Sequence, residues 1–258
     1  MIHPENTMLT TQRKQRILEQ LAAEGQVLAK QLSEAFGVSE DTVRRDLREL
    51  ASEGRLQRVH GGALPVSGTV VSFDARSRMA MGAKHQLARA AASLILPGQV
   101  VMIDGGTTSG ELVKCLPLTL AATVVTHSPS VAVALVNHPG IEVVLIGGRL
   151  YKHSLVAVGA AAVEALATIR ADVFFMGVTG VHPQAGFSTG DREEAYIKRA
   201  LAARAAETVV MATQDKLNVA SRYAIGELAM ASTLIVESAV PEAVTAPFAQ
   251  AGLSLIRA

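Results

Sequence analysis

Seven short runs of Val, Ile and Leu recur between residues 99 and 258, and Ala-rich stretches of helical pattern separate them. Most of these runs are continuously apolar, as expected of strands that are buried on both faces of a parallel sheet. The alternation is typical of βαβ units, so it predicts an α/β domain with a mostly parallel sheet. The predicted strands are Val100–Ile103, Thr123–Thr126, Glu142–Ile146, Val173–Gly177, Thr208–Met211, Leu234–Val236 and Ser254–Ile256. The predicted helices are a stretch around Lys84–Leu96, then Thr108–Cys115, Ser130–Val136, Ala160–Ile169, Arg192–Ala206 and Pro241–Gln250.

The first 62 residues follow a different pattern, in which apolar residues recur at helical spacing among frequent charges. The predicted helices there are Thr10–Glu24, Ala29–Phe36 and a third that Ser39 caps and that ends near Glu53. A tight turn at Gly37 joins the last two, which is the frame of a helix-turn-helix. Apolar alternation and a glycine pair over Arg55–Gly62 predict a small β-wing after it.

The third helix has one apolar side and one basic side. Its apolar side is formed by Val43, Leu47 and Leu50. Its outward side carries Asp41, Arg44, Arg45 and Arg48. Such a row is often only a solvated surface, but here it coincides with the turn, the cap and the inward triplet. Arginines in this position bind guanine edges in the major groove or phosphates, so the pattern favours DNA binding.

The total charge gives no support to DNA binding by itself, because 24 Lys and Arg residues face 23 Asp and Glu residues. Aromatic residues make up 3% of the chain, which argues against a stacking platform for single strands. Residues 1–62 are neutral as well, with nine residues of each sign, and five of their cations lie within Arg44–Arg58. This distribution predicts modest non-specific affinity per subunit and dependence on oligomerisation for tight binding.

A stretch rich in Gly, Pro and Ser begins at His60 and is typical of a linker. The chain is predicted to divide into a first unit over residues 1–62, a linker over residues 63–80 and a second unit over residues 81–258.

The apolar runs of the chain stop well short of the roughly 18 residues of a transmembrane helix. Met1–Leu9 contains no apolar stretch of signal-peptide length. The single cysteine forms no intrachain disulfide. We therefore expect a cytoplasmic protein that binds no membrane.

Glycines and hydroxyl residues follow several of the predicted strands. The strongest such turn is Asp104-Gly105-Gly106-Thr107-Thr108, which leads into a helix, where free N–H groups favour a phosphate. Thr126-His127, Gly147-Gly148 and Gly177 also follow strands, and Lys216 offers a cation after another. In open α/β sheets ligands bind beyond the carboxyl ends of the strands, so we expect these turns to converge on an anion site. Each turn taken alone is also compatible with a plain tight turn, and Lys216 with an exposed lysine.

A catalytic interpretation of the second half rests on Asp191, Glu193, Glu194 and Lys198, which offer an isomerase a base and its partners. The same spacing is typical of a capped and solvated helix face with a Glu–Lys pair. No His-x-x-His or Cys-x-x-Cys pair occurs, so no metal site is predicted, and no cofactor is expected.

The segment Val38–Leu50 contains Thr42-Val43-Arg44-Arg45-Asp46-Leu47, and His60-Gly61-Gly62-Ala63 follows it. These two motifs, in this order, resemble the DeoR family of bacterial repressors. The resemblance implies a winged helix-turn-helix in which Ser39, Thr42, Arg44 and Arg45 face DNA. Arg48 on the same predicted helix and Arg58 in the predicted wing are expected to bind DNA as well. Asp46 is expected to pair with a neighbouring Arg and not to meet DNA, since a carboxylate repels phosphate.

The resemblance continues through the second half and implies a sensor domain similar to the ribose-5-phosphate isomerase fold. Its family elements include Arg76, Lys84, Gly159, Asp172, Glu194 and Lys198. It implies a phosphorylated sugar as effector, with Glu194 and Lys198 among its contacts, and a homo-oligomer, either dimer or tetramer. The chain departs from the family pattern at Thr126-His127, where Thr-Asn is common, and at Thr213–Lys216, where Asp-x-Ser-Lys is common. Both departures bear on the identity of the ligand.

The sequence is therefore interpreted as a DNA-binding transcriptional regulator and not an enzyme. Specifically, we expect a repressor of a sugar or polyol utilisation operon that a phosphorylated sugar releases from double-stranded operator DNA. One alternative is a phosphosugar isomerase-like enzyme with an accessory DNA-binding domain. Another is a DNA-binding protein whose α/β half serves only for oligomerisation.

Overall fold

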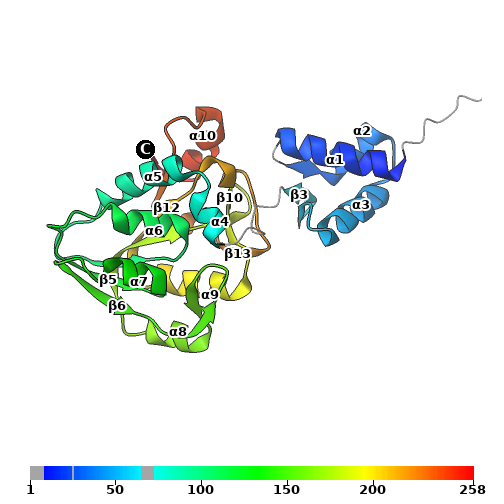
Figure 1. The fold of residues 1–258 in the computed structure, drawn as a ribbon. Helices are drawn as coiled ribbons and strands as arrows, with labels where there is room; N and C mark the ends of the chain where they lie inside the picture. Colours follow the sequence, from blue (N-terminus) through cyan, green and yellow to red (C-terminus); the bar gives the residue numbers. More distant parts are fainter. Residues whose placement is uncertain (1–8, 25, 65–72) are drawn as a thin grey trace, which may run out of the picture.

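The computed structural model describes residues 9–24, 26–64 and 73–258. These residues form two units with separate hydrophobic cores, one within residues 10–64 and one within residues 73–258 (Figure 1). The prediction that Met1–Leu9 contains no signal peptide concerns residues of which the structure describes only Leu9. No helix in the described ranges is both long and apolar enough to span a membrane.

The smaller unit is a helix-turn-helix with a small three-stranded sheet. Its elements are α1 (Thr10–Glu24), β1 (Val27–Leu28), α2 (Ala29–Phe36), α3 (Glu40–Ser52), β2 (Gln57–Val59) and β3 (Gly62–Leu64). The predicted helices are confirmed to within one or two residues. The predicted wing is the antiparallel β2–β3 hairpin, and β1 pairs with the other edge of β3. Ile17 and Leu32 pack with the apolar side of α3 in the core.

A buried ion pair fastens α1 to α3. Asp46 is completely buried, and its carboxylate accepts hydrogen bonds from Arg13 Nε at 2.5 Å and Arg13 Nη2 at 3.1 Å. The Arg partner expected for Asp46 thus comes from another helix, 33 residues away. Because both charges are buried and paired, Asp46 is a structural residue of the unit.

The larger unit is built on a parallel sheet with the strand order β15-β14-β12-β9-β4-β5-β6. These strands are β4 (Val100–Ile103), β5 (Ala122–Thr126), β6 (Ile141–Leu145), β9 (Ala171–Gly177), β12 (Ala205–Met211), β14 (Thr233–Val236) and β15 (Ser254–Arg257). Every pairing within the sheet is parallel. All seven predicted strands are confirmed as members of it.

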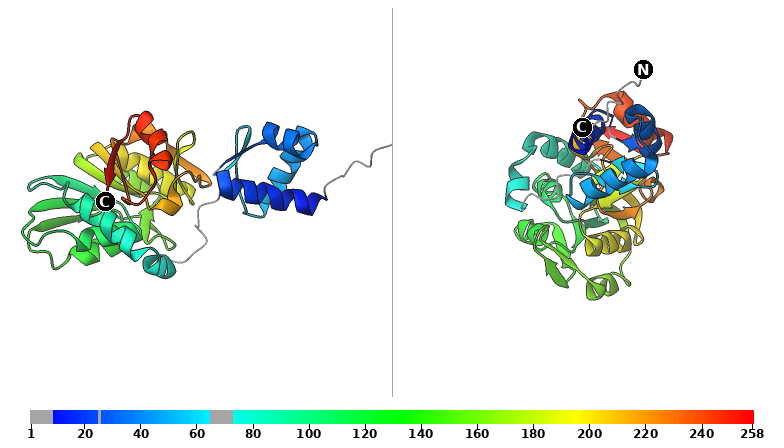
Figure 2. Two further views of the ribbon diagram at one scale, coloured as in Figure 1. Left: turned by 90° about the horizontal axis from the view of Figure 1, so that it is seen from above. Right: turned by 90° about the vertical axis from the view of Figure 1, so that its right-hand side faces the viewer.

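Helices cover both faces of this sheet (Figures 1 and 2). One face is covered by α5 (Met81–Ala92), α6 (Thr107–Lys114) and α7 (Pro129–Leu135). The other face packs against α8 (Ala160–Ala165), α9 (Arg192–Ala202) and α10 (Glu242–Gln250). The predicted helices ending at Ile169 and Ala206 are too long. α8 is followed by a turn over residues 166–168, and Ala205 and Ala206 belong to β12.

Several short elements carry no clear sequence signal. They are α4 (Phe73–Arg78), β7 (Arg149–Tyr151), β8 (Val156–Val158), β10 (Gly180–His182), β11 (Gly186–Thr189), η1 (Gln214–Lys216), β13 (Tyr223–Gly226) and η2 (Leu228–Met230). With three or four residues each, the strands are too short for a period to show. β7–β8 follows β6, β10–β11 follows β9 and η1 follows β12, so these segments extend the carboxyl edge of the sheet.

The predicted linker over residues 63–80 differs from the structure at both ends. Ala63 and Leu64 are buried in β3, and Phe73–Arg78 forms α4. The middle of that linker, residues 65–72, lies outside the described residues.

Candidate functional site

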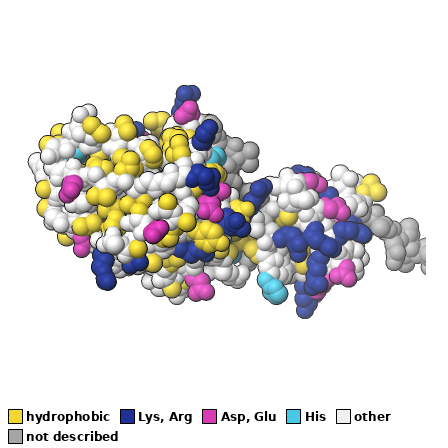
Figure 3. Space-filling view, turned by 90° about the horizontal axis from the view of Figure 1, so that it is seen from below, with side chains coloured by type: hydrophobic (Ala, Val, Ile, Leu, Met, Phe, Trp, Pro, Cys, Tyr) yellow, Lys and Arg dark blue, Asp and Glu magenta, His cyan; other side chains and the backbone are white. Residues whose placement is uncertain are grey.

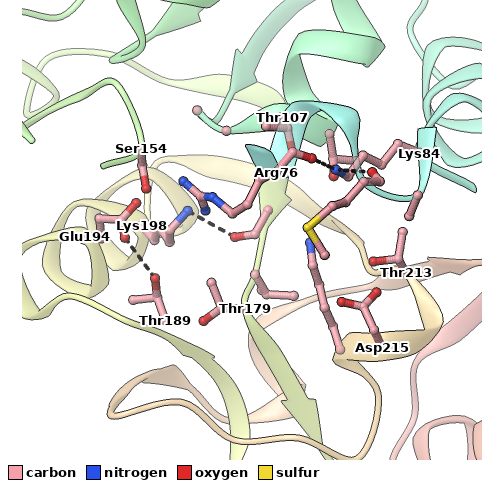
Figure 4. Close-up of a pocket in the computed structure, with 18 residues that line it drawn as sticks. Arg76, Lys84, Thr107, Ser154, Thr179, Thr189, Glu194, Lys198, Thr213 and Asp215 are labelled. Atoms are coloured by element: carbon pink, nitrogen blue, oxygen red, sulfur yellow. Dashed lines mark hydrogen bonds between the residues drawn. The ribbon is translucent and has the colours of Figure 1, made fainter. Parts of the chain in front are cut away.

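A cavity of about 360 Å³ lies at the carboxyl edge of the large sheet (Figure 4). This volume is in the range of pockets that hold small metabolites. Of the residues predicted to bind an effector, those that line it are Gly105, Gly106, Thr107, Thr108, Gly177, Glu194, Lys198 and Lys216. Lining residues outside that predicted set are Arg76, Met79, Ala80, Lys84, Ser154, Val178, Thr179, Thr189, Thr213 and Asp215, of which Val178, Thr179, Thr213 and Asp215 lie in segments expected near the ligand.

The turn between β4 and α6 forms one wall of the cavity. Gly106 is the N-cap residue of α6, has a φ of 100° and provides no side-chain cap. The first N–H groups of the helix therefore remain available beside the Thr107 and Thr108 side chains, as an anion requires. A Cβ on Gly105 would lie 2.0 Å from Val156 Cγ1, so only glycine fits where this turn packs against β8.

Asp104 lies behind this turn, fully buried, and it does not line the cavity. Its carboxylate accepts hydrogen bonds from the backbone N–H groups of Gly105 and Gly177, both at 2.8 Å, and from Lys198 Nζ. His127 Nε2 lies 2.9 Å from the same carboxylate. Burial alone would raise the pKa of Asp104, but Lys198 and His127 outweigh it and lower this pKa to about 2. Asp104 thus positions two glycine turns and a cavity lysine.

Thr126, His127, Gly147 and Gly148 also do not line the cavity, although the turns containing them were expected to converge there. β8 packs over these turns: Ala157 N donates to His127 O at 2.7 Å, and His127 Nδ1 lies 2.9 Å from Ala157 O. A Cβ on Gly148 would lie 3.0 Å from Val158 O. The β7–β8 hairpin, which the sequence prediction missed, therefore takes the place nearest the cavity and contributes Ser154.

Four cationic side chains line the cavity: Arg76, Lys84, Lys198 and Lys216. Lys84 Nζ donates to Arg76 O and to Met79 O, the latter at 2.7 Å, and so holds the end of α4. Burial lowers the pKa of Lys84, and it lowers the pKa of Lys216 to about 8. Neighbouring cations contribute to both lowered pKa values and Asp215 opposes them, so a bound anion would relieve the repulsion between these cations.

The acidic residues and the lysine on which the catalytic interpretation rests lie at the start of α9, where they make structural contacts. Asp191 caps the helix by accepting from Glu193 N at 2.9 Å and Glu194 N at 3.1 Å. Glu194 and Lys198 are buried and not solvated as the helix-face alternative would require. Glu194 Oε2 accepts from Thr189 Oγ1 at 3.1 Å, while Lys198 pairs with Asp104.

The basic side of α3 is exposed as the sequence predicts, whereas Val43, Leu47 and Leu50 are buried. Ser39 caps the helix by accepting from Thr42 N at 3.2 Å. Arg44 pairs with Glu40 at 2.7 Å and lies 3.8 Å from Asp41. Arg45, Arg48 and Arg58 are exposed. Figure 3 shows Lys and Arg side chains gathered on the smaller unit.

Comparison with known proteins gives this geometry its context. Residues 13–69 match a family model described as a DeoR-like helix-turn-helix domain, and residues 80–238 match the DeoR C terminal sensor domain. The chain belongs to the DeoR family. It is accordingly a DNA-binding transcriptional regulator and not an enzyme.

Two relatives illustrate the relationship. The HTH-type transcriptional regulator GlpR of Haloferax volcanii is 34% identical over 81% of this chain and 83% of its own length. The HTH-type transcriptional repressor GlcR of Bacillus subtilis is 31% identical over 89% of each chain. A solved structure of ribose 5-phosphate isomerase A from Methanocaldococcus jannaschii matches with a TM-score of 0.39, at 17% identity over 52% of each chain. That likeness is too limited to carry an argument about this DeoR-family chain.

Proposed function

We propose that this DeoR-family regulator represses a sugar or polyol utilisation operon in the cytoplasm and is released from its operator by a phosphorylated sugar. The observation that carries the proposal is the cavity at the carboxyl edge of the sheet. It combines an uncapped helix N-terminus with buried cations and with hydroxyl and carboxylate side chains. This mixture suits a ligand that is anionic at one end and rich in hydroxyl groups elsewhere.

The phosphate is proposed to bind at the start of α6. There the Thr107 and Thr108 side chains, the free N–H groups of the helix and the Lys216 ammonium offer donors and positive charge. Lys198 contributes less, because its ammonium is already bound to Asp104 and to Gly177 O. Asp104 and His127 are proposed to act indirectly on the ligand, because they hold the strand-end turns in place and do not line the cavity.

A homo-oligomer is also proposed, on the basis of apolar side chains at one edge of the sensor domain. Val133 and Val136 of the α7 region are 70% and 73% exposed, and Leu145 of β6 is 51% exposed. α7 packs beside β6, the outermost strand of the sheet. Exposed apolar residues next to an edge strand are typical of an association surface, and a second copy would allow two α3 helices to bind one operator.

The test has two stages. Duplexes bound by the full chain are first selected from genomic fragments, and their affinity is then measured with and without a panel of phosphorylated sugars and polyols. We expect one phosphorylated compound to weaken operator binding and its unphosphorylated counterpart to have no effect. Lys216→Gln and Thr107→Ala are expected to bind the operator normally and to respond less. If no phosphorylated compound changes either operator affinity or melting temperature, the proposed effector class is wrong.

A further inference from the structure

A second, smaller compartment of about 210 Å³ adjoins the cavity. Arg76, Ser154, Thr179 and Glu194 line both spaces, so the two share a wall. The smaller compartment adds Tyr151, His153, Gly190 and Arg222. These residues come from the β7–β8 hairpin and from the segments before α9 and β13. Thr107 and Thr108 of α6 line the cavity but not this compartment.

Two nitrogen atoms of this wall have no protein partner. Arg76 Nε and His153 Nε2 are buried, and neither makes a hydrogen bond within the described residues. The guanidinium is held in place because Arg76 Nη2 donates to His153 O at 2.5 Å, and it extends toward Ser154 and Glu194 (Figure 4). A buried polar nitrogen without a partner destabilises the folded protein. A polar ligand group in the compartment would give a partner to the Arg76 Nε donor and to the ring nitrogen of His153, whichever role that nitrogen takes.

The charges of the wall decide which chemical group fits. Arg76 is accompanied by the buried carboxylate of Glu194, of which Oε2 accepts from Thr189. Burial, together with Arg76, lowers the pKa of His153, which favours its neutral ring. A second phosphate or a carboxylate would meet the guanidiniums of Arg76 and Arg222, but it would also lie against the Glu194 carboxylate. A hydroxyl group can donate to Glu194 and accept from Arg76, so it satisfies both.

We infer that the second compartment binds the hydroxyl-bearing end of the effector, opposite its phosphate, through Arg76, His153 and Glu194. This inference rests on the proposed function. It restricts the effector class to monophosphates whose hydroxylated chain reaches from the start of α6 to β7–β8.

Recognition there also acts on α4, which carries Arg76 and is the first described element after the junction with the DNA-binding unit. The backbone of α4 is held by Lys84, another cavity residue. A ligand whose hydroxylated end reaches the second compartment therefore bonds to Arg76 of α4, whereas inorganic phosphate at the start of α6 leaves that compartment empty.

The experiment measures binding of the full chain by calorimetry, using a panel of pentitol, hexitol, pentose and hexose monophosphates. Glycerol 3-phosphate and inorganic phosphate serve as short ligands, and a hexitol 1,6-bisphosphate as a doubly charged one. The variants are Glu194→Gln and His153→Phe, which retains a ring beside Tyr151. Lys216→Gln is the matched change at the phosphate end. Circular dichroism checks that each variant is folded.

We expect the best-bound monophosphate to lose about tenfold or more in affinity in Glu194→Gln, which replaces a charged acceptor by a neutral amide, and in His153→Phe, which removes a ring nitrogen. The same variants are expected to bind inorganic phosphate within about twofold of the wild type, and Lys216→Gln to weaken both ligands. The bisphosphate should bind more weakly than the monophosphate, and only the long monophosphate should weaken operator binding.

If Lys216→Gln weakens the best monophosphate but both second-compartment variants bind it normally, the inference is wrong and the proposed function stands. Tighter binding of the bisphosphate would also overturn the inference, because it would show that the compartment takes an anion. If no compound in the panel binds the wild type, both proposals fail.

Discussion

The buried carboxylates Asp46 and Asp104 each join segments that are far apart in the sequence. Asp46 fastens α3 to α1 through Arg13, and Asp104 joins the ends of β4 and β9 to Lys198 of α9. Removing one partner of such a pair leaves an uncompensated buried charge, which is strongly destabilising. At the scale of single residues, these pairs stabilise the two units and exclude both aspartates from direct ligand contact.

Asp104→Asn is expected to lower the free energy of unfolding of the sensor unit by about 3–5 kcal/mol, because Lys198 loses its counter-charge. The folded-state pKa of Asp104 is lowered to about 2. Its contribution to stability is therefore complete above about pH 4 and is lost as the pH falls through about 2. Urea titrations at several pH values measure both effects. Asp172→Asn is the control, since that exposed carboxylate accepts from Val100 N, and an equal loss there would contradict the argument.

Lys216 gives the effector response a pH dependence. Its pKa is lowered to about 8 by burial, so the ammonium is charged below that pH and neutral above it. A phosphate monoester has a second pKa near 6 and is a dianion throughout this range. Effector affinity should accordingly fall as the pH rises through about 8, with proton uptake on binding. Calorimetry in buffers of different ionisation enthalpy measures this. A Lys216→Gln variant with the same pH profile would show that another group titrates.

Arg45 is exposed on α3, and Arg45→Ala is expected to weaken operator binding by about 1–3 kcal/mol. Arg44 is paired with Glu40, so Arg44→Ala also frees a carboxylate near the DNA, and its effect mixes two causes. Fluorescence anisotropy at several salt concentrations separates phosphate contacts from base contacts. Arg192→Ala, an exposed arginine of the sensor unit, serves as the control. Equal binding by Arg45→Ala and this control would remove Arg45 from the interface.

At the scale of elements, the wing depends on close backbone contact. Gly61 has a φ of 80° in the turn between β2 and β3, and Gly62 pairs with Leu28 and Val59. A Cβ on Gly62 would lie 2.0 Å from Val27 O. The glycine pair of the motif thus serves two needs, a left-handed turn and room for β1.

Gly62→Ala is expected to destabilise the DNA-binding unit by about 1–3 kcal/mol, because β1 must move away from β3. Operator affinity should fall with it, while effector binding stays unchanged. Thermal unfolding and anisotropy measure the two properties. Gly82→Ala, where an added Cβ meets open space within α5, should leave both unaffected. Full operator affinity in Gly62→Ala would argue against a rigid wing.

At the scale of the whole molecule, the two edges of the large sheet differ. β6 forms one edge beside the exposed Val133 and Val136, and β15 forms the other. The near-neutral charge of the DNA-binding unit gives one subunit little non-specific affinity, so the second subunit is the expected source of tight operator binding.

Val133→Asp combined with Val136→Asp is expected to shift the protein toward monomer in analytical ultracentrifugation and to weaken operator binding. Both side chains are more than two thirds exposed, so the fold of each subunit should be retained. Ala251→Asp, an exposed position after α10 near β15, is the matched control. If the double variant keeps the wild-type mass, the association surface lies elsewhere.

The sequence by itself determined the two-part organisation, the three helices of the first unit and all seven strands of the large sheet. These features depend on local periodicity, caps and glycine motifs, which a short window of residues contains. It also determined the family, through two motifs in a fixed order.

Only the tertiary structure decided which strand-end residues face the cavity. Asp104 and His127 follow strands just as Thr107 does, yet they do not line the cavity. Their side chains contact each other, and His127 also contacts the backbone of β8. Arg76 and Ser154 reach the cavity from α4 and from the β7–β8 hairpin, 78 residues apart in the chain. Burial and pairing of this kind arise from contacts between distant segments, and no local pattern records them.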